Sequence, residues 1–249
     1  MGDTIQSVER AAAILRLLAS GPRQLGVAEL ARALGLPKGT LHGILRTLVH
    51  VGFVEQDDGT GKYRLGATLL HLGSSYLDVN ELRTRSLNWA DALAGRSRES
   101  AWIGTPHQGQ VLVIHHVFRP DDSMQTLQVG TYLPLHASAL GKVLLAYDPY
   151  GESLDSPLQA YTPKTLTTHV DLEAELDLVR AQGWAGEMEE LVEGEVAIAA
   201  PIKDPRGLVV GSIGVRGAVE RLAGDGGLHM QFVSYVRDAA RAITRDLAR

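Results

Sequence analysis

The chain has 249 residues, of which 45% are hydrophobic, 21% are charged and none is cysteine. The lack of cysteine excludes disulfides and thiol nucleophiles, and no apolar run approaches the roughly 20 residues that span a bilayer. Residues 1–66 hold eight Lys/Arg against six Asp/Glu, whereas the remainder holds sixteen against twenty-three. A mildly basic segment on an acidic body indicates two functions. Because MGDTIQSVERAA lacks a signal-peptide pattern, we expect a cytoplasmic protein without membrane contact.

The first 66 residues predict three helices followed by a hairpin. Apolar residues recur at helical spacing over 5–20, 27–34 and 36–50. Ser20-Gly21-Pro22 and two later glycines end these helices. FVEQ and KYRL, separated by the turn-rich DDGTG, predict two paired strands. The expected apolar face of the first helix consists of Val8, Ala11, Ala12, Leu15 and Leu18.

The second and third helices have the spacing of a helix-turn-helix. Gly35 falls in the turn, where a positive φ favours glycine, and Ala31 falls where the two helices cross closely. The third helix would then place its amino-terminal turns in a major groove of DNA. The residues expected on its outward face are Lys38, Gly39, Thr40, His42, Gly43 and Arg46.

This outward face combines small and basic side chains. The two glycines would let the backbone approach DNA closely, while Lys38 and Arg46 meet phosphate or guanine and Thr40 and His42 reach base edges. The hairpin would then be a wing that contacts the neighbouring DNA backbone or minor groove. The wing residues expected at that contact are Lys62, Tyr63 and Arg64.

The rest of the chain predicts a connector and a second domain. Residues 67–94 read as a linker helix that could pack on a second copy of itself. Residues 95–249 alternate the strands SAWIGT, QVLVIHHVF, LQVG, VAIAAPIKD and GLVVGSIGVRG with helices at 138–147, 171–183 and 228–247. Strands that pair locally, with helices between them, predict an α+β domain on a mainly antiparallel sheet.

Several stretches resemble the IclR family of transcriptional regulators. They are SVERAAAILRLLA, VAELARALGLPKGTLHGILRTL, GFVEQ, KYRLG, LPLHASALGKVLLA and GEVAIAAPIKDPRGLVVGSIGVRG, and together they cover nearly the whole chain. The resemblance implies an α+β protein with a winged helix-turn-helix, a dimerising linker helix and a GAF-like effector domain. It also implies a homodimer, or a dimer of dimers, that binds double-stranded operator DNA under control of a small metabolite, usually an organic acid.

Within the family, GTLHGILRTL, GFVEQ, SYLDV and IHHVFRPDDS resemble most the regulators of glycerol operons in actinomycetes. The effector-contacting positions that the resemblance implies are Leu133, Ala139, Leu140, Glu187, Glu195, Ala197, Gly214 and Arg216. Position 216 is commonly a small hydroxyl residue in the family, so the arginine here is a departure.

The chemistry of the residues agrees with an effector site. A helix that begins near Ser138 would offer the amides of Ala139, Leu140 and Gly141 to a carboxylate or phosphate. Strand alternation places Val209, Ile213 and Val215 on a core face, and Ser212, Gly214 and Arg216 on a small polar face. We hypothesise that Arg216 pairs with the phosphate of glycerol 3-phosphate while Glu187 accepts hydrogen bonds from its hydroxyls; alternatively, the Arg216 charge reaches water.

Other residues invite different functions. His115 and His116 are neighbours on a strand, so they point to opposite faces and cannot share a metal. His136 lies near Ser138, but no nucleophile elbow surrounds this serine. The acidic run EMEELVEGE could bind a cation, but it reads rather as a solvated loop that closes over the pocket. The tryptophans are expected to be packing residues, although Trp102 or Trp184 could wall that pocket. The sequence thus predicts no catalytic residues, metal or cofactor.

Three classes of function compete. The first is a ligand-responsive regulator, either of glycerol use or of another pathway through a small organic acid. The second is an enzyme with a winged-helix appendage, and the third is an interaction protein whose winged domain binds another protein. Turnover assays on a panel of small molecules would expose the second class, and DNA binding that weakens steeply with salt distinguishes the first class from the third.

Overall fold

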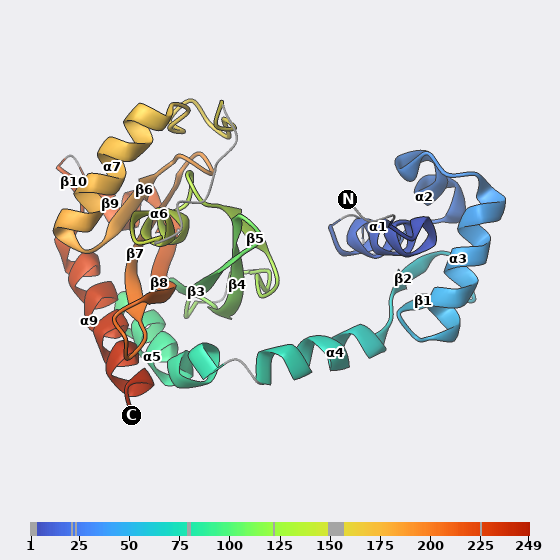
Figure 1. Ribbon diagram of the computed structural model, residues 1–249, viewed down its shortest axis with the longest axis horizontal. Helices are drawn as coiled ribbons and strands as arrows, with labels where there is room; N and C mark the ends of the chain where they lie inside the picture. Colours follow the sequence, from blue (N-terminus) through green and yellow to red (C-terminus); the bar gives the residue numbers. More distant parts are fainter. Residues whose placement is uncertain are drawn as a thin grey trace. The chain divides into compact units, whose positions relative to one another are not determined.

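The computed structural model describes residues 4–20, 22, 24–78, 81–121, 123–148, 157–224 and 226–249, with backbone alone for 74–78. Gly21 of the predicted helix stop and residues 79–80 of the predicted linker lie outside this description. The chain divides into two compact units, Met1–Val79 and Asn80–Arg249 (Figure 1). None of the described helices is both long and apolar enough for a bilayer span.

The first unit is a helix-turn-helix followed by a wing. It contains α1 (Gln6–Ser20), α2 (Val27–Leu34), α3 (Lys38–His50) and the antiparallel strands β1 (Val54–Gln56) and β2 (Tyr63–Leu65). Gly35 ends α2 with a φ of 63°, the left-handed conformation that the turn was expected to need. The order of elements is therefore the predicted one.

The core of this unit forms where the helices meet. Leu30, Leu41 and Leu45 are fully buried between α2 and α3. On α1, however, the prediction of the buried face was wrong at one end. Val8 is 62% exposed, and Ile14, which no expected face included, is completely buried. The buried stripe of α1 runs through Ile14 and Leu18 because these positions face α3 and the wing.

Two helices follow the wing. α4 (Ala67–Asp78) continues through Gly73, and α5 (Glu81–Ser97) begins after the two residues outside the description. α5 packs along α9 (Met230–Leu247) and against the sheet, so it belongs to the second unit rather than to a free connector. The residues predicted as one linker over 67–94 are thus divided between the two units.

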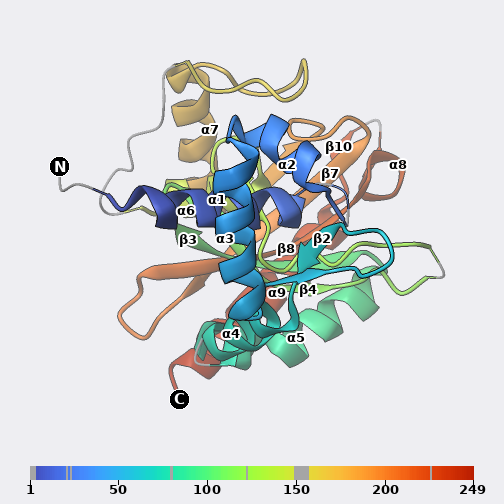
Figure 2. The ribbon, with the colours of Figure 1, turned by 90° about the vertical axis from the view of Figure 1, so that its right-hand side faces the viewer.

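The second unit is built on a six-stranded antiparallel sheet. Its strands lie in the order β5 (Tyr132–Pro134), β4 (Gln110–Val117), β3 (Ser100–His107), β8 (Val209–Ala218), β7 (Glu195–Lys203) and β6 (Ala185–Met188). α6 (Ala139–Ala146) and α7 (His169–Gln182) cover one face, while α5 and α9 cover the other (Figures 1 and 2). Short α8 (Val219–Leu222) and the two-residue strands β9 (Ala223–Gly224) and β10 (Gly227–Leu228) precede α9.

Three details of the sheet differ from the prediction, the first being that β6 was not expected as a strand. LQVG is not a strand: Gly130 has a φ of 87° in a turn, and β5 pairs with β4 instead. Val209 does not share a face with Ile213 and Val215, because a bulge near Ile202 shifts the register of β7 against β8. Val209 consequently packs on the α6 side of the sheet.

Candidate functional site

The outward face of α3 is open to solvent. Lys38, Gly39, His42, Gly43 and Arg46 are exposed, and Thr40 is half-buried. A hollow of about 420 Å³ lies between this face and the wing. Its lining residues are Gly39, His42, Gly43, Arg46, Val49, Gln56 and Tyr63.

The glycines of α3 have no packing role within the protein. Among the described residues, a Cβ added at Gly39 or Gly43 would meet nothing within 4 Å. A glycine inside a helix is nevertheless destabilising by roughly 0.5–1 kcal/mol relative to alanine. The fold therefore gains nothing from the small size of these residues, and a close approach by something outside the chain explains it.

The wing residues divide into three kinds. Lys62 is exposed, whereas Arg64 forms an ion pair of 3.0 Å with Glu55 on the adjacent strand. Tyr63 is only 5% exposed and packs in the core of the unit, while its backbone bridges to Leu25. Tyr63 therefore lies at the floor of the hollow rather than on its exposed rim, because its side chain points into the core of the unit.

A small inner cavity lies between α6 and the sheet of the second unit. Its volume, about 20 Å³, is that of a single water or hydroxyl group. Most of the predicted effector residues line it, namely Leu133, Ala139, Leu140, Glu187, Ala197, Gly214 and Arg216. Five separate elements therefore bring these positions together, as the resemblance implied.

Glu187 supplies the polar group of the inner cavity. It is 1% exposed, and its Oε1 accepts hydrogen bonds from the backbone amides of Glu190 and Leu191 at 2.8 and 3.2 Å. Its Oε2 is buried without a partner among the described residues. Burial raises the pKa of Glu187 to about 7. One carboxylate oxygen is therefore available for a donor from a ligand.

A larger outer cavity, of about 630 Å³, adjoins the inner one through shared walls at Trp102, Leu133 and Arg216. Three arginines line it, and each is held by a carboxylate. Arg216 Nε donates to Glu195 Oε2 at 2.5 Å, Arg221 is paired with Glu99, and Arg119 is paired with Asp121. Arg216 faces the cavity and is only 14% exposed. Its guanidinium group therefore lies in the wall of the cavity, paired with Glu195.

Two expectations at the helix of the cavity need correction. Ser138 Oγ caps α6 by accepting from the amide of Gly141 at 3.1 Å, which leaves the amides of Ala139 and Leu140 as candidate donors. Ser212 does not line either cavity, because its buried hydroxyl donates to the carbonyl of Leu140 at 3.1 Å. Through these hydrogen bonds, the hydroxyls of Ser138 and Ser212 hold α6 in place.

The acidic run after β6 is more than a solvated loop. Glu187 and Glu190 are buried, and Lys142 on α6 lies between this turn and α7. Lys142 Nζ is 2.7 Å from Glu190 Oε1, 3.2 Å from the carbonyl of Gly186 and 3.3 Å from Glu175 Oε1. This cluster fixes the turn that follows β6 and binds Glu187, so the prediction of a solvated loop was wrong.

His116 is a cavity residue that the sequence reading considered only as a metal ligand. Its ring lies 5.0 Å from that of Trp102, and its Nδ1 accepts from the backbone amide of Gln128 at 3.2 Å. Arg221 and Glu99 were also missed, because residues 122 positions apart in the chain share no local pattern. The adjacent His115 faces the Arg83 and Asp91 charges of α5 instead, so the two histidines do lie on opposite faces.

Comparison with known proteins agrees with this two-part arrangement. Residues 7–58 match the IclR helix-turn-helix domain, and residues 74–245 match the bacterial transcriptional regulator IclR C-terminal domain. A glycerol operon regulatory protein of Streptomyces coelicolor is 55% identical, with 99% of this chain and 98% of the relative covered. The protein of the same name from Streptomyces griseus is 53% identical over the same shares.

Solved structures show the same fold. An IclR-type transcriptional regulator from Alicyclobacillus acidocaldarius has a TM-score of 0.84 and 27% identity, and covers 98% of this chain and 100% of its own. An IclR homologue from Microbacterium hydrocarbonoxydans, complexed with 4-hydroxybenzoate, has a TM-score of 0.82 and 25% identity over 97% and 99% of the two chains. The chain therefore belongs to the IclR family of transcriptional regulators, which bind DNA and a small-molecule effector, and it is not an enzyme.

Proposed function

We propose that the chain regulates an operon for glycerol use by placing α3 in the major groove of its operator. The observation that supports this surface is the pair of exposed glycines, Gly39 and Gly43, flanked by His42 and Arg46. Lys38, Thr40, Lys62 and Arg64 complete the proposed contact surface. The curated relatives at 55% and 53% identity carry the name of glycerol operon regulators, which supports the choice of pathway. Binding to chromosomal DNA would place the protein in the cytoplasm.

Two substitutions test the proposed DNA surface. Arg46→Ala is expected to weaken operator binding by about 1–3 kcal/mol if Arg46 reads a base, with little loss on unrelated DNA. Lys62→Ala is expected to weaken binding to all sequences alike and to reduce the salt slope by about 1. Titrations of operator and scrambled duplexes at several salt concentrations measure both effects. Unchanged operator affinity in both variants would show that another surface reads the DNA.

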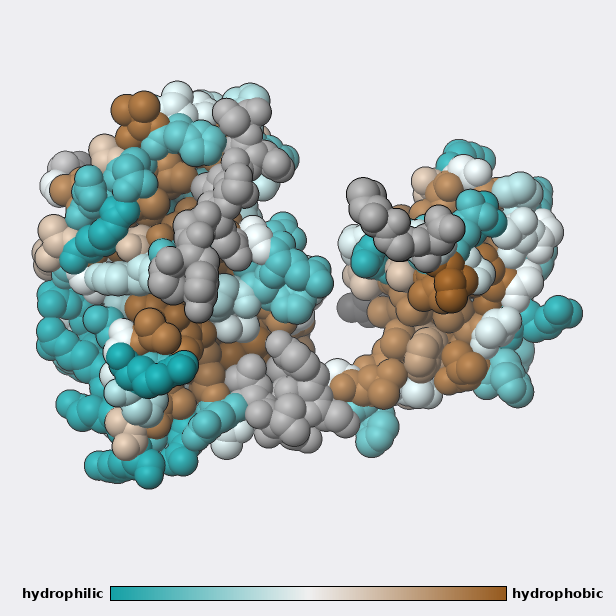
Figure 3. Space-filling model, in the orientation of Figure 1, coloured by the Kyte–Doolittle hydropathy of each residue, from teal (hydrophilic) through white to brown (hydrophobic). Residues whose placement is uncertain are grey.

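A homodimer, assembled further into a dimer of dimers, would supply the second reading helix. One helix covers only a few base pairs, so two-fold pairing is needed for a longer palindromic site. The apolar surface of the first unit supports this assembly: Leu70 and Leu72 of α4 are 75% and 50% exposed, and the first turns of α4 carry hydrophobic surface in Figure 3. Exposed leucines of this kind favour a second copy as their cover.

The proposed effector is glycerol 3-phosphate, with its phosphate in the outer cavity and a hydroxyl at Glu187. The support is the polarity of the two cavities: three arginines line the outer one, and an unpartnered carboxylate oxygen faces the inner one. An organic acid is the second candidate, because a solved relative is complexed with 4-hydroxybenzoate. Either carboxylate or phosphate would compete with Glu195 for Arg216.

This competition gives the effector test. Arg216→Ser should weaken glycerol 3-phosphate binding by about tenfold, the size of one charge-assisted hydrogen bond. Glu195→Gln should tighten it several-fold, since Arg216 would no longer be held by a carboxylate. Calorimetric titration measures both, with uncharged glycerol as the control ligand that neither change affects. Equal affinities of wild type and Arg216→Ser would rule out the proposed phosphate position.

A further inference from the structure

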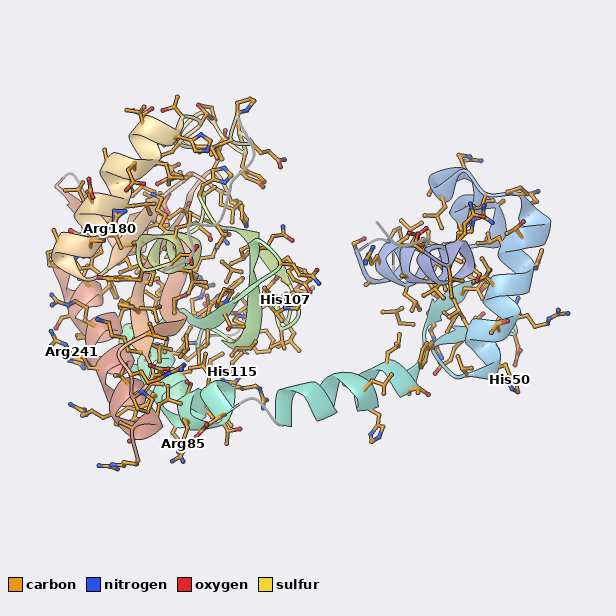
Figure 4. The ribbon with its side chains drawn as sticks, viewed as in Figure 1. His50, Arg85, His107, His115, Arg180 and Arg241 are labelled. Carbon is orange, nitrogen blue, oxygen red and sulfur yellow. The ribbon has the colours of Figure 1, made fainter. Side chains whose placement is uncertain are left out.

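A second hollow lies on the face of the sheet opposite the effector cavities. It has a volume of about 450 Å³ and is formed where α9 meets β7, beside the ends of α6 and α7. Its cationic lining consists of Lys203, Arg237, Arg241 and Arg245, and no carboxylate is among its described lining residues. Figure 4 shows Arg241 pointing outward from α9, away from the sheet.

The arginines of this hollow differ from others in the same unit. Arg96, Arg180 and Arg206 each have a carboxylate partner. In the described part of the chain, Arg237, Arg241 and Arg245 form no ion pair within 4.0 Å. Arg241 and Arg245 also line an adjoining hollow that includes Asp238, but the carboxylate of Asp238 is paired with Arg96 at 3.4 Å.

The arrangement is unfavourable without an anion. The three arginines follow each other at intervals of four residues on one helix face, where like charges destabilise the helix. Arg245, in the last turn, is favoured by the helix dipole, but Arg237 and Arg241 lie too far from the end of α9 to benefit. Lys203 Nζ lies 5.4 Å from the centre of the Tyr147 ring, so an aromatic ring rather than a carboxylate positions it.

We propose that this hollow binds a phosphorylated small molecule with at least two negative charges, at a site separate from the effector cavities. Successive arginines are about 6 Å apart along the helix axis, so one multiply charged anion can contact two guanidinium groups. Arginine matches phosphate oxygens bidentately. The volume also lies within the usual range for small-molecule sites, roughly 300–1,000 Å³. The Thr244 hydroxyl, which accepts from the Lys203 amide at 3.0 Å, adds a donor at the edge.

The test uses the full chain and inorganic pyrophosphate as the probe, titrated calorimetrically at low ionic strength. The double substitution Arg237→Gln/Arg241→Gln should weaken binding by at least tenfold. Arg98→Gln removes one positive charge from an exposed position outside the hollow and should leave the affinity unchanged, whereas the charge-matched single substitution Arg241→Gln should weaken it. Because the double substitution relieves repulsion, its Tm should not fall.

Four outcomes would overturn the proposal. The wild type could fail to bind pyrophosphate, or Arg98→Gln could weaken pyrophosphate binding as much as the double substitution does. Pyrophosphate binding could instead be lost in Arg216→Ser and kept in the double variant. Finally, the double substitution could change only the molecular mass of the assembly in solution and leave pyrophosphate binding as it is. The third would assign the anion to the effector cavity, and the fourth would make the hollow an interface between copies of the chain. None of these outcomes bears on operator binding through α3, so the two proposals fail independently.

Discussion

Lys142→Met is expected to lower the free energy of unfolding by about 3–5 kcal/mol, the cost of leaving a buried charge without its partner. Lys142 is 1% exposed, and its ammonium group lies 2.7 Å from Glu190 Oε1. Burial already raises the pKa of Glu190, while Lys142 opposes that rise. Without Lys142, Glu190 must either remain charged in the interior or take up a proton.

The stability deficit of Lys142→Met is expected to depend on pH. In the variant, the folded pKa of Glu190 rises further above its unfolded value, so the folded state binds more protons than the unfolded state. Stability is then retained in acid and lost as pH rises toward the folded pKa. Urea unfolding at pH 5 and pH 8 should therefore show a small deficit at the lower pH and a large one at the higher.

A matched control is the lysine that pairs with another glutamate of the same turn. Lys164→Met removes an ion pair with Glu189, but Lys164 is 59% exposed. Exposed pairs contribute about 0–1 kcal/mol, so this variant should unfold nearly as the wild type does. The double variant Lys142→Met/Glu190→Gln should recover most of the lost stability, because neither buried charge remains. Equal losses in Lys142→Met and Lys164→Met would contradict the buried network.

This buried cluster also shows where sequence reasoning ended. Local rules predicted the helix-turn-helix, the wing and most strands, because periodicity, turn glycines and caps are properties of neighbouring residues. Lys142, Glu175 and Glu190 come from three separate elements, and no pattern along the chain links them. From the sequence alone an acidic run is expected to be exposed to solvent, because the lysine that pairs with it is distant along the chain.

The cavities show the same difference between features set by neighbouring residues and contacts between distant elements. The alternation along β8 correctly placed Gly214 and Arg216 on one side, and it failed at Val209, where a bulge shifts the register. Resemblance supplied positions such as Leu133 and Glu187, which come from different elements. It could not indicate that Glu195 already holds Arg216, because pairing between strands appears only after folding.

Gly43→Leu is expected to make the protein more stable and to weaken its operator binding strongly. Leucine is favoured over glycine inside a helix by roughly 0.8–1 kcal/mol, and its Cβ would meet nothing within 4 Å in the free protein. The unfolding free energy should therefore rise. On DNA, the added side chain occupies the space between helix and base edges, so at least one base contact of about 1–3 kcal/mol should be lost.

The opposite signs of these two effects make the experiment decisive. Gly95→Leu is the control, because Gly95 is also an exposed glycine inside a helix whose Cβ would meet nothing within 4 Å, but it lies on α5. Both variants should gain stability in denaturant unfolding, while only Gly43→Leu should lose operator affinity in a DNA titration. Gly43→Ala should fall between leucine and wild type in affinity, because the obstruction grows with side-chain size. Full operator affinity in Gly43→Leu would mean that α3 does not lie in the groove, since no groove-bound helix could accommodate leucine where the backbone had made its closest approach.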